Sequence, residues 1–89
     1  MSFPLRSRGQ RGLALAALGK FPTIRLVNSM LNVPPCEVVL EVNETRYRYD
    51  FGYDCDVAWS VAAGADSRNP RVQVAALNRA RKYLVKRRS

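Results

Sequence analysis

Apolar and polar residues alternate along two neighbouring stretches in the middle of the chain, residues 37–42 and 45–51. Only Asn43-Glu44 separates them, so a two-residue turn would pair positions whose numbers add up to 87. One face of this pairing is apolar, with Leu40 opposite Tyr47, Val38 opposite Tyr49 and Cys36 opposite Phe51. Because alternation and pairing agree, the pattern predicts a two-stranded antiparallel hairpin. A longer loop remains an alternative, since Glu suits the second turn position less well than Gly.

The second half of this hairpin alternates Arg with aromatic residues, which allows two interpretations. Arginine and tyrosine together can hold phosphates and stack bases, as they do in proteins that bind single strands. However, Tyr47, Tyr49 and Phe51 share a face with aliphatic residues, which is typical of a core. We therefore favour burial of the aromatic side chains, with Arg46 and Arg48 outside the core as candidate contacts.

Helical patterns lie on both sides of the hairpin. Residues 1–22 are predicted to form a basic arm, extended over 1–10 and helical over 11–19, because Leu and Ala favour helices. Thr23 can cap a further helix that runs to about Leu31. Beyond the hairpin, Asp54 can cap a helix that ends at Gly64.

The C-terminal stretch predicts a longer helix with an apolar face and an adjoining basic ridge, which carries Arg71, Arg79, Lys82 and Lys86. Asn69-Pro70 supplies a cap and a first-turn proline, and the helix runs to about Arg87. Its apolar stripe consists of Val72, Ala76, Leu77, Ala80, Tyr83 and Leu84. The fold class is therefore α+β, a small single domain with helical N-terminal segments, a central two-stranded hairpin and two C-terminal helices. Residues 23–89 form its body.

Charge is unevenly distributed along the 89 residues. Fifteen Lys and Arg face seven Asp and Glu, which gives a net charge of +8, and twelve of the fifteen are Arg. Residues 1–26 carry five basic residues and residues 67–89 carry eight, both without an acid, while residues 27–66 hold all seven acids. A neutral-to-acidic body with basic ends is typical of a protein anchored by its termini to a polyanion. Arg suits phosphate because it can donate two parallel hydrogen bonds.

Catalytic and metal chemistry find little support in the sequence. The chain has no His, which is the commonest general base and metal ligand. Cys36 and Cys55 are the only thiols; we expect them to be reduced, with a disulfide as the alternative. The aspartates at 50, 54 and 56 lack the spacing of a calcium loop, and helix capping accounts for two of them. We therefore predict no enzyme, no cofactor, no metal site and no small-molecule substrate.

The Arg-rich, acid-free arm is similar in composition to a mitochondrial targeting segment. A secretory signal fits less well, because the apolar run from Leu13 to Leu18 is short. We therefore expect a mitochondrial protein on the matrix side.

These observations predict a non-catalytic structural subunit of a large ribonucleoprotein, a mitochondrial ribosomal protein that binds ribosomal RNA and neighbouring proteins. The expected RNA-binding residues are all basic and lie near the two ends: Arg6, Arg8, Arg11, Arg71, Arg79, Arg81, Lys82, Lys86, Arg87 and Arg88. The alternative is an accessory subunit of a mitochondrial inner-membrane respiratory or ATP synthase complex, and only in that case would the chain contact a membrane. A DNA-binding or virion protein also remains open.

Overall fold

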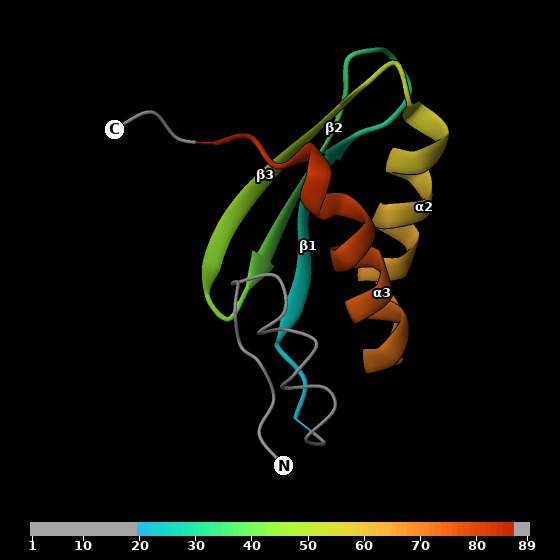
Figure 1. The fold of residues 1–89 in the computed structure, drawn as a ribbon. Coiled ribbons are helices and arrows are strands. Elements are labelled where there is room, and N and C mark those ends of the chain that lie inside the picture. The colour runs from blue at the N-terminus through green and yellow to red at the C-terminus, as the bar shows by residue number, and fades with distance from the viewer. Residues whose placement is uncertain (1–19, 87–89) are drawn as a thin grey trace.

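The computed structural model describes residues 20–86, which form a three-stranded antiparallel sheet and two helices (Figure 1). The strands are β1 (Ile24–Met30), β2 (Cys36–Val42) and β3 (Thr45–Gly52), and they lie side by side in that order. The helices α2 (Cys55–Ala65) and α3 (Pro70–Ala80) follow, and a 3-10 turn, η1 (Arg81–Tyr83), comes last. The chain is thus a small α+β domain. The prediction of a two-stranded hairpin preceded by helical segments is wrong.

The hairpin of β2 and β3 has the register that alternation predicts. Glu37 pairs with Asp50, Leu40 with Tyr47 and Glu41 with Arg46. Asn43 and Glu44 both have positive φ, 49° and 70°, as a two-residue turn between twisted strands requires. At the other end a register shift pairs Cys36 with Gly52 instead of Phe51.

Residues 24–30 form strand β1, not the helix predicted from Thr23 to about Leu31. The strand pairs with β2 and so satisfies main-chain groups that a two-stranded hairpin would leave open. A bulge between Leu26 and Asn28 shifts the register by one residue. It interrupts the period-two pattern, which is why the apolar positions Ile24, Val27 and Leu31 resemble a helical face. The predicted helix over 11–19 lies outside the described residues.

Both C-terminal helices exist, with corrected boundaries and caps. Asn69 accepts a hydrogen bond from the main-chain N–H of Arg71 and caps α3 as predicted, whereas the side chain of Asp54 makes no capping bond to α2. Helix α3 ends at Ala80 and not at Arg87. After η1 the chain becomes extended and pairs with β3: Leu84 forms a bridge with Tyr49. At that point the main-chain groups of the C-terminal segment bond to the edge of β3 instead of forming another helical turn.

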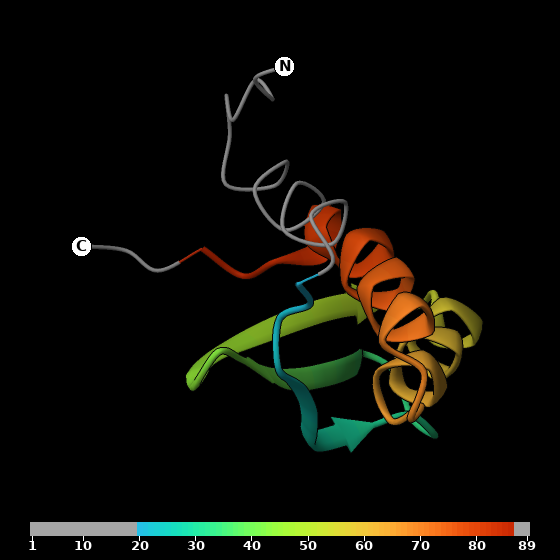
Figure 2. The ribbon, with the colours of Figure 1, turned by 90° about the horizontal axis from the view of Figure 1, so that it is seen from below.

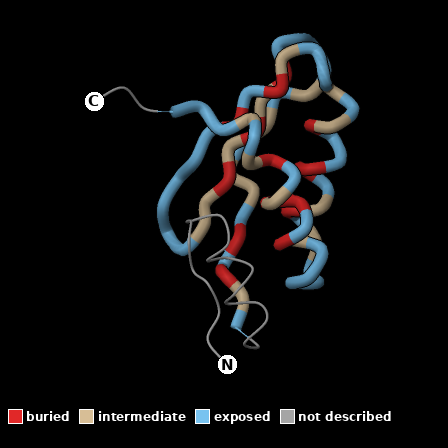
Figure 3. Tube along the Cα trace, viewed as in Figure 1, coloured by how far each residue is buried: buried red, intermediate tan, exposed pale blue. Residues whose placement is uncertain are grey.

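The core lies between the helices and one face of the sheet (Figures 2 and 3). Helix α2 contacts all three strands, and α3 packs along α2. The two helices approach closely at Gly64, where an added Cβ would lie 2.7 Å from the Cβ of Ala76. The buried apolar residues of α3 are Val74, Ala76, Leu77 and Ala80, so two members of the predicted stripe, Val72 and Leu84, are exposed instead. Among residues 20–86, no helix covers the opposite face of the sheet.

Cys36 and Cys55 form a disulfide, so the expectation of two reduced thiols is wrong. The two residues do not face each other across the hairpin, but the chain folds back after β3. Gly52 has a φ of 58°, and the N–H of Asp54 bonds to the carbonyl of Phe51. This turn places the first residue of α2 beside the first residue of β2. The crosslink therefore joins sheet to helix instead of strand to strand.

Candidate nucleic-acid interface

The described basic residues of the predicted RNA-binding set do not form one ridge. Arg71 lies in the first turn of α3, and Arg79 in its last turn. Arg81 and Lys82 belong to η1, whereas Lys86 lies in the extended segment beyond it. Because the helix ends at Ala80, the helical spacing that would have aligned them is lost. The remaining five, Arg6, Arg8, Arg11, Arg87 and Arg88, lie outside the described residues.

Three of these cations already interact within the molecule. Arg79 donates from Nη1 to the Ser60 hydroxyl at 2.7 Å, which fastens α3 to α2. The Nζ of Lys82 lies 5.6 Å from the ring centre of Tyr83, a cation–π distance. Arg81 is half-buried, and its positive charge acts on the hydroxyl of Tyr49. Arg71 and Lys86 are exposed and carry no ion pair or hydrogen bond from their side chains among the described residues.

Lys86 instead joins basic residues from a distant part of the sequence. The main-chain N–H of Val85 donates to the carbonyl of Arg48 at 2.9 Å, which draws the C-terminal segment along β3. An open groove lies between the two. Its lining combines apolar, aromatic and basic side chains: Val39, Thr45, Arg46, Tyr47, Arg48, Leu84, Val85 and Lys86. Three cations from two segments about forty residues apart in sequence thus gather at one edge of the sheet.

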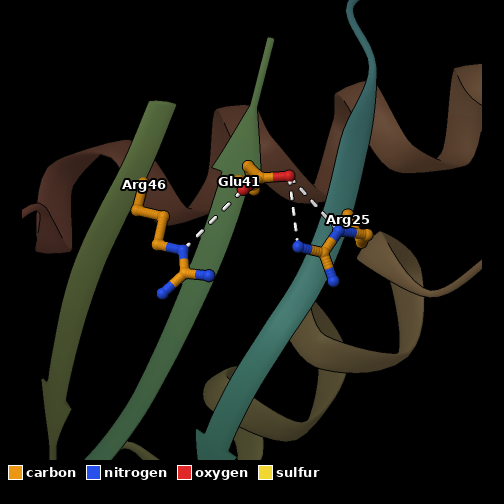
Figure 4. A network of polar contacts seen from close by, with 3 residues as sticks. All are labelled: Arg25, Glu41 and Arg46. Carbon is orange, nitrogen blue, oxygen red and sulfur yellow. Dashed lines mark hydrogen bonds and ion pairs between the residues drawn. The ribbon is translucent and has the colours of Figure 1, made fainter. Parts of the chain in front are cut away.

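The two arginines of the groove make ion pairs on the open face of the sheet. Arg48 lies 3.5 Å from Glu37, and Arg46 lies 3.7 Å from Glu41. Glu41 is shared, because Arg25 donates to its other oxygen from both Nε and Nη2 at 3.2 Å (Figure 4). More than half of each arginine side chain is exposed, so such pairs contribute little to stability and exchange readily.

The two tyrosines of β3 differ sharply although they share a face. Tyr49 is 2% exposed beneath the helices, and burial raises its pKa to about 12, with the nearby Tyr47 adding to the rise and Arg81 opposing it. Tyr47 lies two residues closer to the hairpin turn and is 38% exposed. The prediction that all the aromatics of this strand belong to the core therefore holds for Tyr49 and Phe51, while Tyr47 is at the rim.

Carboxylates gather at the end of the sheet where α2 begins. Asp50 accepts a hydrogen bond from the N–H of Gly52, and Asp54 accepts one from the Tyr83 hydroxyl at 3.4 Å. Burial and the Asp54 carboxylate together raise the pKa of Tyr83. Within residues 20–86 no group of three acidic or Cys side chains could hold a metal ion. These aspartates shape the turn that leads into the helix.

The same end exposes large apolar side chains. Tyr53 is 90% exposed, Val33 69% and Trp59 53%, and the indole N–H of Trp59 donates to the carbonyl of Leu31. Exposed apolar residues that lie close together are typical of a protein contact surface. Among residues 20–86, no helix has both the length and the apolar character that crossing a bilayer requires.

Sequence reasoning missed the groove because its residues come together only through tertiary structure. Arg46 and Arg48 were considered candidate contacts, but neither was placed with Lys86. The signal that could have indicated the groove is a pair of exposed arginines, flanked by aromatic residues, on an edge strand. In comparisons with known proteins, no family model, curated protein or solved structure matches the chain.

Proposed function

We propose that the chain is a non-catalytic structural subunit of a large ribonucleoprotein, a mitochondrial ribosomal protein on the matrix side, and that it holds ribosomal RNA through its basic surfaces. The observation that carries the proposal is the convergence of Arg46, Arg48 and Lys86 on one groove. Clustered arginine and lysine side chains on an exposed surface are the usual contacts to phosphates. The predicted basic residues at both ends of the chain would extend this contact.

The distribution of charge within the body supports an orientation. The exposed side chains of Tyr53 and Trp59 belong to the segment 50–59, which also carries Asp50, Asp54 and Asp56. None of these aspartates forms an ion pair with a described residue. Phosphates would be repelled from that end. We assign it to neighbouring proteins of the assembly and the β3 groove to RNA.

The test measures RNA affinity of the full chain over a salt series. Replacing both Arg48 and Lys86 by Ala should reduce the slope of log affinity against log salt by about 0.7–0.9 for each lost phosphate contact. Arg68→Ala is the matched control, because Arg68 is exposed but lies in the loop between the helices, away from the groove. An unchanged slope in the double variant, together with unchanged incorporation into RNase-sensitive particles, would show that the groove does not bind RNA.

The disulfide favours a second candidate, an accessory subunit of a mitochondrial inner-membrane complex. Disulfides persist in oxidising compartments and are rare where thiols are kept reduced. Such a subunit would face the oxidising side of the membrane, with its basic ends on anionic lipid or acidic subunits. Native protein that migrates with detergent-sensitive particles, and is indifferent to RNase, would establish this candidate over the ribosomal one.

A further inference from the structure

We infer that the β3 groove binds single-stranded RNA, with one unpaired base stacked on Tyr47 and the adjacent phosphates held by Arg46, Arg48 and Lys86. The inference rests on the proposed function and specifies its substrate class. It begins from the lining of the groove, which follows the edge of β3. Arg46 and Arg48 reach this edge from the open face of the sheet, and Tyr47 reaches it from the face that the helices cover farther along. Lys86 lies alongside on the C-terminal segment. Rings that carry bases and cations that follow the backbone are the two components of single-strand recognition.

The ring of Tyr47 is accessible in a way that the other aromatics of the strand are not. Tyr49 is 2% exposed and Phe51 3%, whereas Tyr47 is 38% exposed, because the helices cover the sheet only as far as Tyr49. Val39, Leu84 and Val85 surround the groove with apolar surface. A base offers a flat apolar face to such a surface, while a phosphate does not. The lining therefore favours a nucleotide over a simple anion.

A duplex would fit this groove poorly. Bases in a duplex are stacked on one another, so their faces cannot reach a protein ring, and the RNA segments that proteins read by stacking are loops, bulges and ends. The groove also follows the edge of a sheet that ends at the hairpin turn, so its three cations line a short track that suits a few nucleotides of one strand.

The ion pair between Arg46 and Glu41 can be replaced by a contact between Arg46 and a phosphate at little cost to the sheet. When Arg46 leaves Glu41 for a phosphate, the carboxylate keeps both hydrogen bonds from Arg25, which are 3.2 Å against the 3.7 Å separation from Arg46 (Figure 4). At this pair no charge is left unpaired, because Glu41 remains partnered, whereas Glu37 has no second ion pair among residues 20–86 once Arg48 moves. Arg25 thus maintains the face of the sheet while its neighbour turns toward the ligand.

The experiment compares a single-stranded twelve-nucleotide oligouridine with a blunt-ended RNA duplex of equal charge, both titrated into the full-length protein. Tyr47→Leu should weaken single-strand binding by about 5- to 150-fold, the loss expected of one stacked base, and leave the salt slope unchanged. Tyr47→Phe should remain within about twofold of the native affinity. Tyr53→Leu is the matched control, because Tyr53 is more exposed but lies at the acidic end. Circular dichroism and thermal unfolding confirm that each variant is folded.

The outcomes separate the two proposals. If Tyr47→Leu binds oligouridine like the native protein while Arg48→Ala/Lys86→Ala loses salt slope, the stacking inference fails and the proposed function stands. Equal losses for single-stranded and duplex RNA would also overturn stacking. If the native protein binds neither RNA, both fail. A photo-crosslink from 5-iodouridine RNA to Tyr47, mapped by mass spectrometry, supplies a readout in the native chain that does not depend on the folding of any variant; its absence from Tyr47, with adducts elsewhere, contradicts the inference.

Discussion

Thr23 and Asn43 exchange two hydrogen bonds: the N–H of Asn43 donates to the carbonyl of Thr23 at 2.9 Å, and the N–H of Thr23 donates to Oδ1 of Asn43 at 3.0 Å. The pair joins the residue that precedes β1 to the turn between β2 and β3. It thus connects all three strands at one end of the sheet. The same asparagine also adopts the positive φ that the turn needs.

Substitutions at Asn43 should separate these two roles. Asn43→Gly keeps the conformational freedom but loses the side-chain acceptor, so it should lower the free energy of unfolding by about 1 kcal/mol. Asn43→Ala adds the cost of a left-handed conformation, about 1–2 kcal/mol more. Urea denaturation of both variants measures the difference. Equal stability of the Gly and Ala variants would show that the positive φ carries no cost here.

Tyr49 and Arg48 are adjacent but should differ greatly in their effect on stability. Tyr49→Ala removes a buried aromatic side chain and should cost about 3–5 kcal/mol. Arg48→Ala breaks an exposed ion pair and should cost less than about 1 kcal/mol. Chemical denaturation of the two variants checks this. Similar losses from both would contradict the placement of the sheet faces.

Alkaline pH should destabilise the fold through Tyr49. Its pKa is near 12 in the folded protein and near 10 when unfolded, so above pH 10 the unfolded chain releases the proton first. The stabilisation of the fold by protonated Tyr49 is complete below pH 10 and declines as the pH rises toward 12. Tyr49→Phe cannot ionise, so its stability relative to the native protein should improve steadily over that interval. A constant difference between the two proteins from pH 9 to 12 would argue against a raised pKa.

The disulfide should be recovered from native protein and should stabilise it. Thiol blocking without reductant, followed by mass spectrometry, should leave Cys36 and Cys55 unmodified until a reductant is added. The two residues are 19 apart in sequence, and closing a loop of that size contributes about 3 kcal/mol. The Cys36→Ala/Cys55→Ala variant should lose about that much in urea. Two blocked thiols in the native protein would instead show that both cysteines are reduced, as expected from the sequence.

The contact between Gly64 and Ala76 should appear as coupling between the two helices. Gly64→Ala places a methyl group within 2.7 Å of the Ala76 side chain and should cost about 1–3 kcal/mol. With Ala76→Gly in the background the space opens, and the same substitution should become neutral or stabilising, since Ala favours a helix. A double-mutant cycle measures this coupling. Additive effects would mean that the helices are farther apart than the structure places them.

Elements of the fold could be predicted where the sequence pattern that specifies them lies within one short segment. The register of β2 and β3 followed from alternation, because two adjacent strands and their turn carry all the information in one short segment. The strand β1 was missed because its bulge after Leu26 interrupts the alternation, and because its pairing partner, not its own sequence, selects the extended conformation. Tertiary context likewise ended α3 at Ala80, where pairing with β3 takes over from helical hydrogen bonds.

The candidate site was less accessible to sequence reasoning than the fold. Charge segregation directed attention to basic residues, but helical periodicity grouped Lys86 with Arg79 and Lys82. The hydrogen bond from Val85 to Arg48 is a long-range contact with no signal in either segment alone. The disulfide was missed for the same reason, since the turn after Gly52 brings Cys55 back to Cys36.

The row of arginines on β3 also determines how copies of the protein behave toward one another. An edge strand invites pairing with the edge of another copy, the first step of many aggregates. Leu84 and Val85 already pair with this edge at Tyr49 and Arg48, so its open part is the hairpin end. Two such ends joined antiparallel would bring Arg46 of one copy near Arg46 of the next, and the like charges would repel. High salt or a polyanion weakens that repulsion. Solubility at high concentration should therefore depend on ionic strength, with the protein dispersed in dilute buffer and prone to self-association where its arginines are screened.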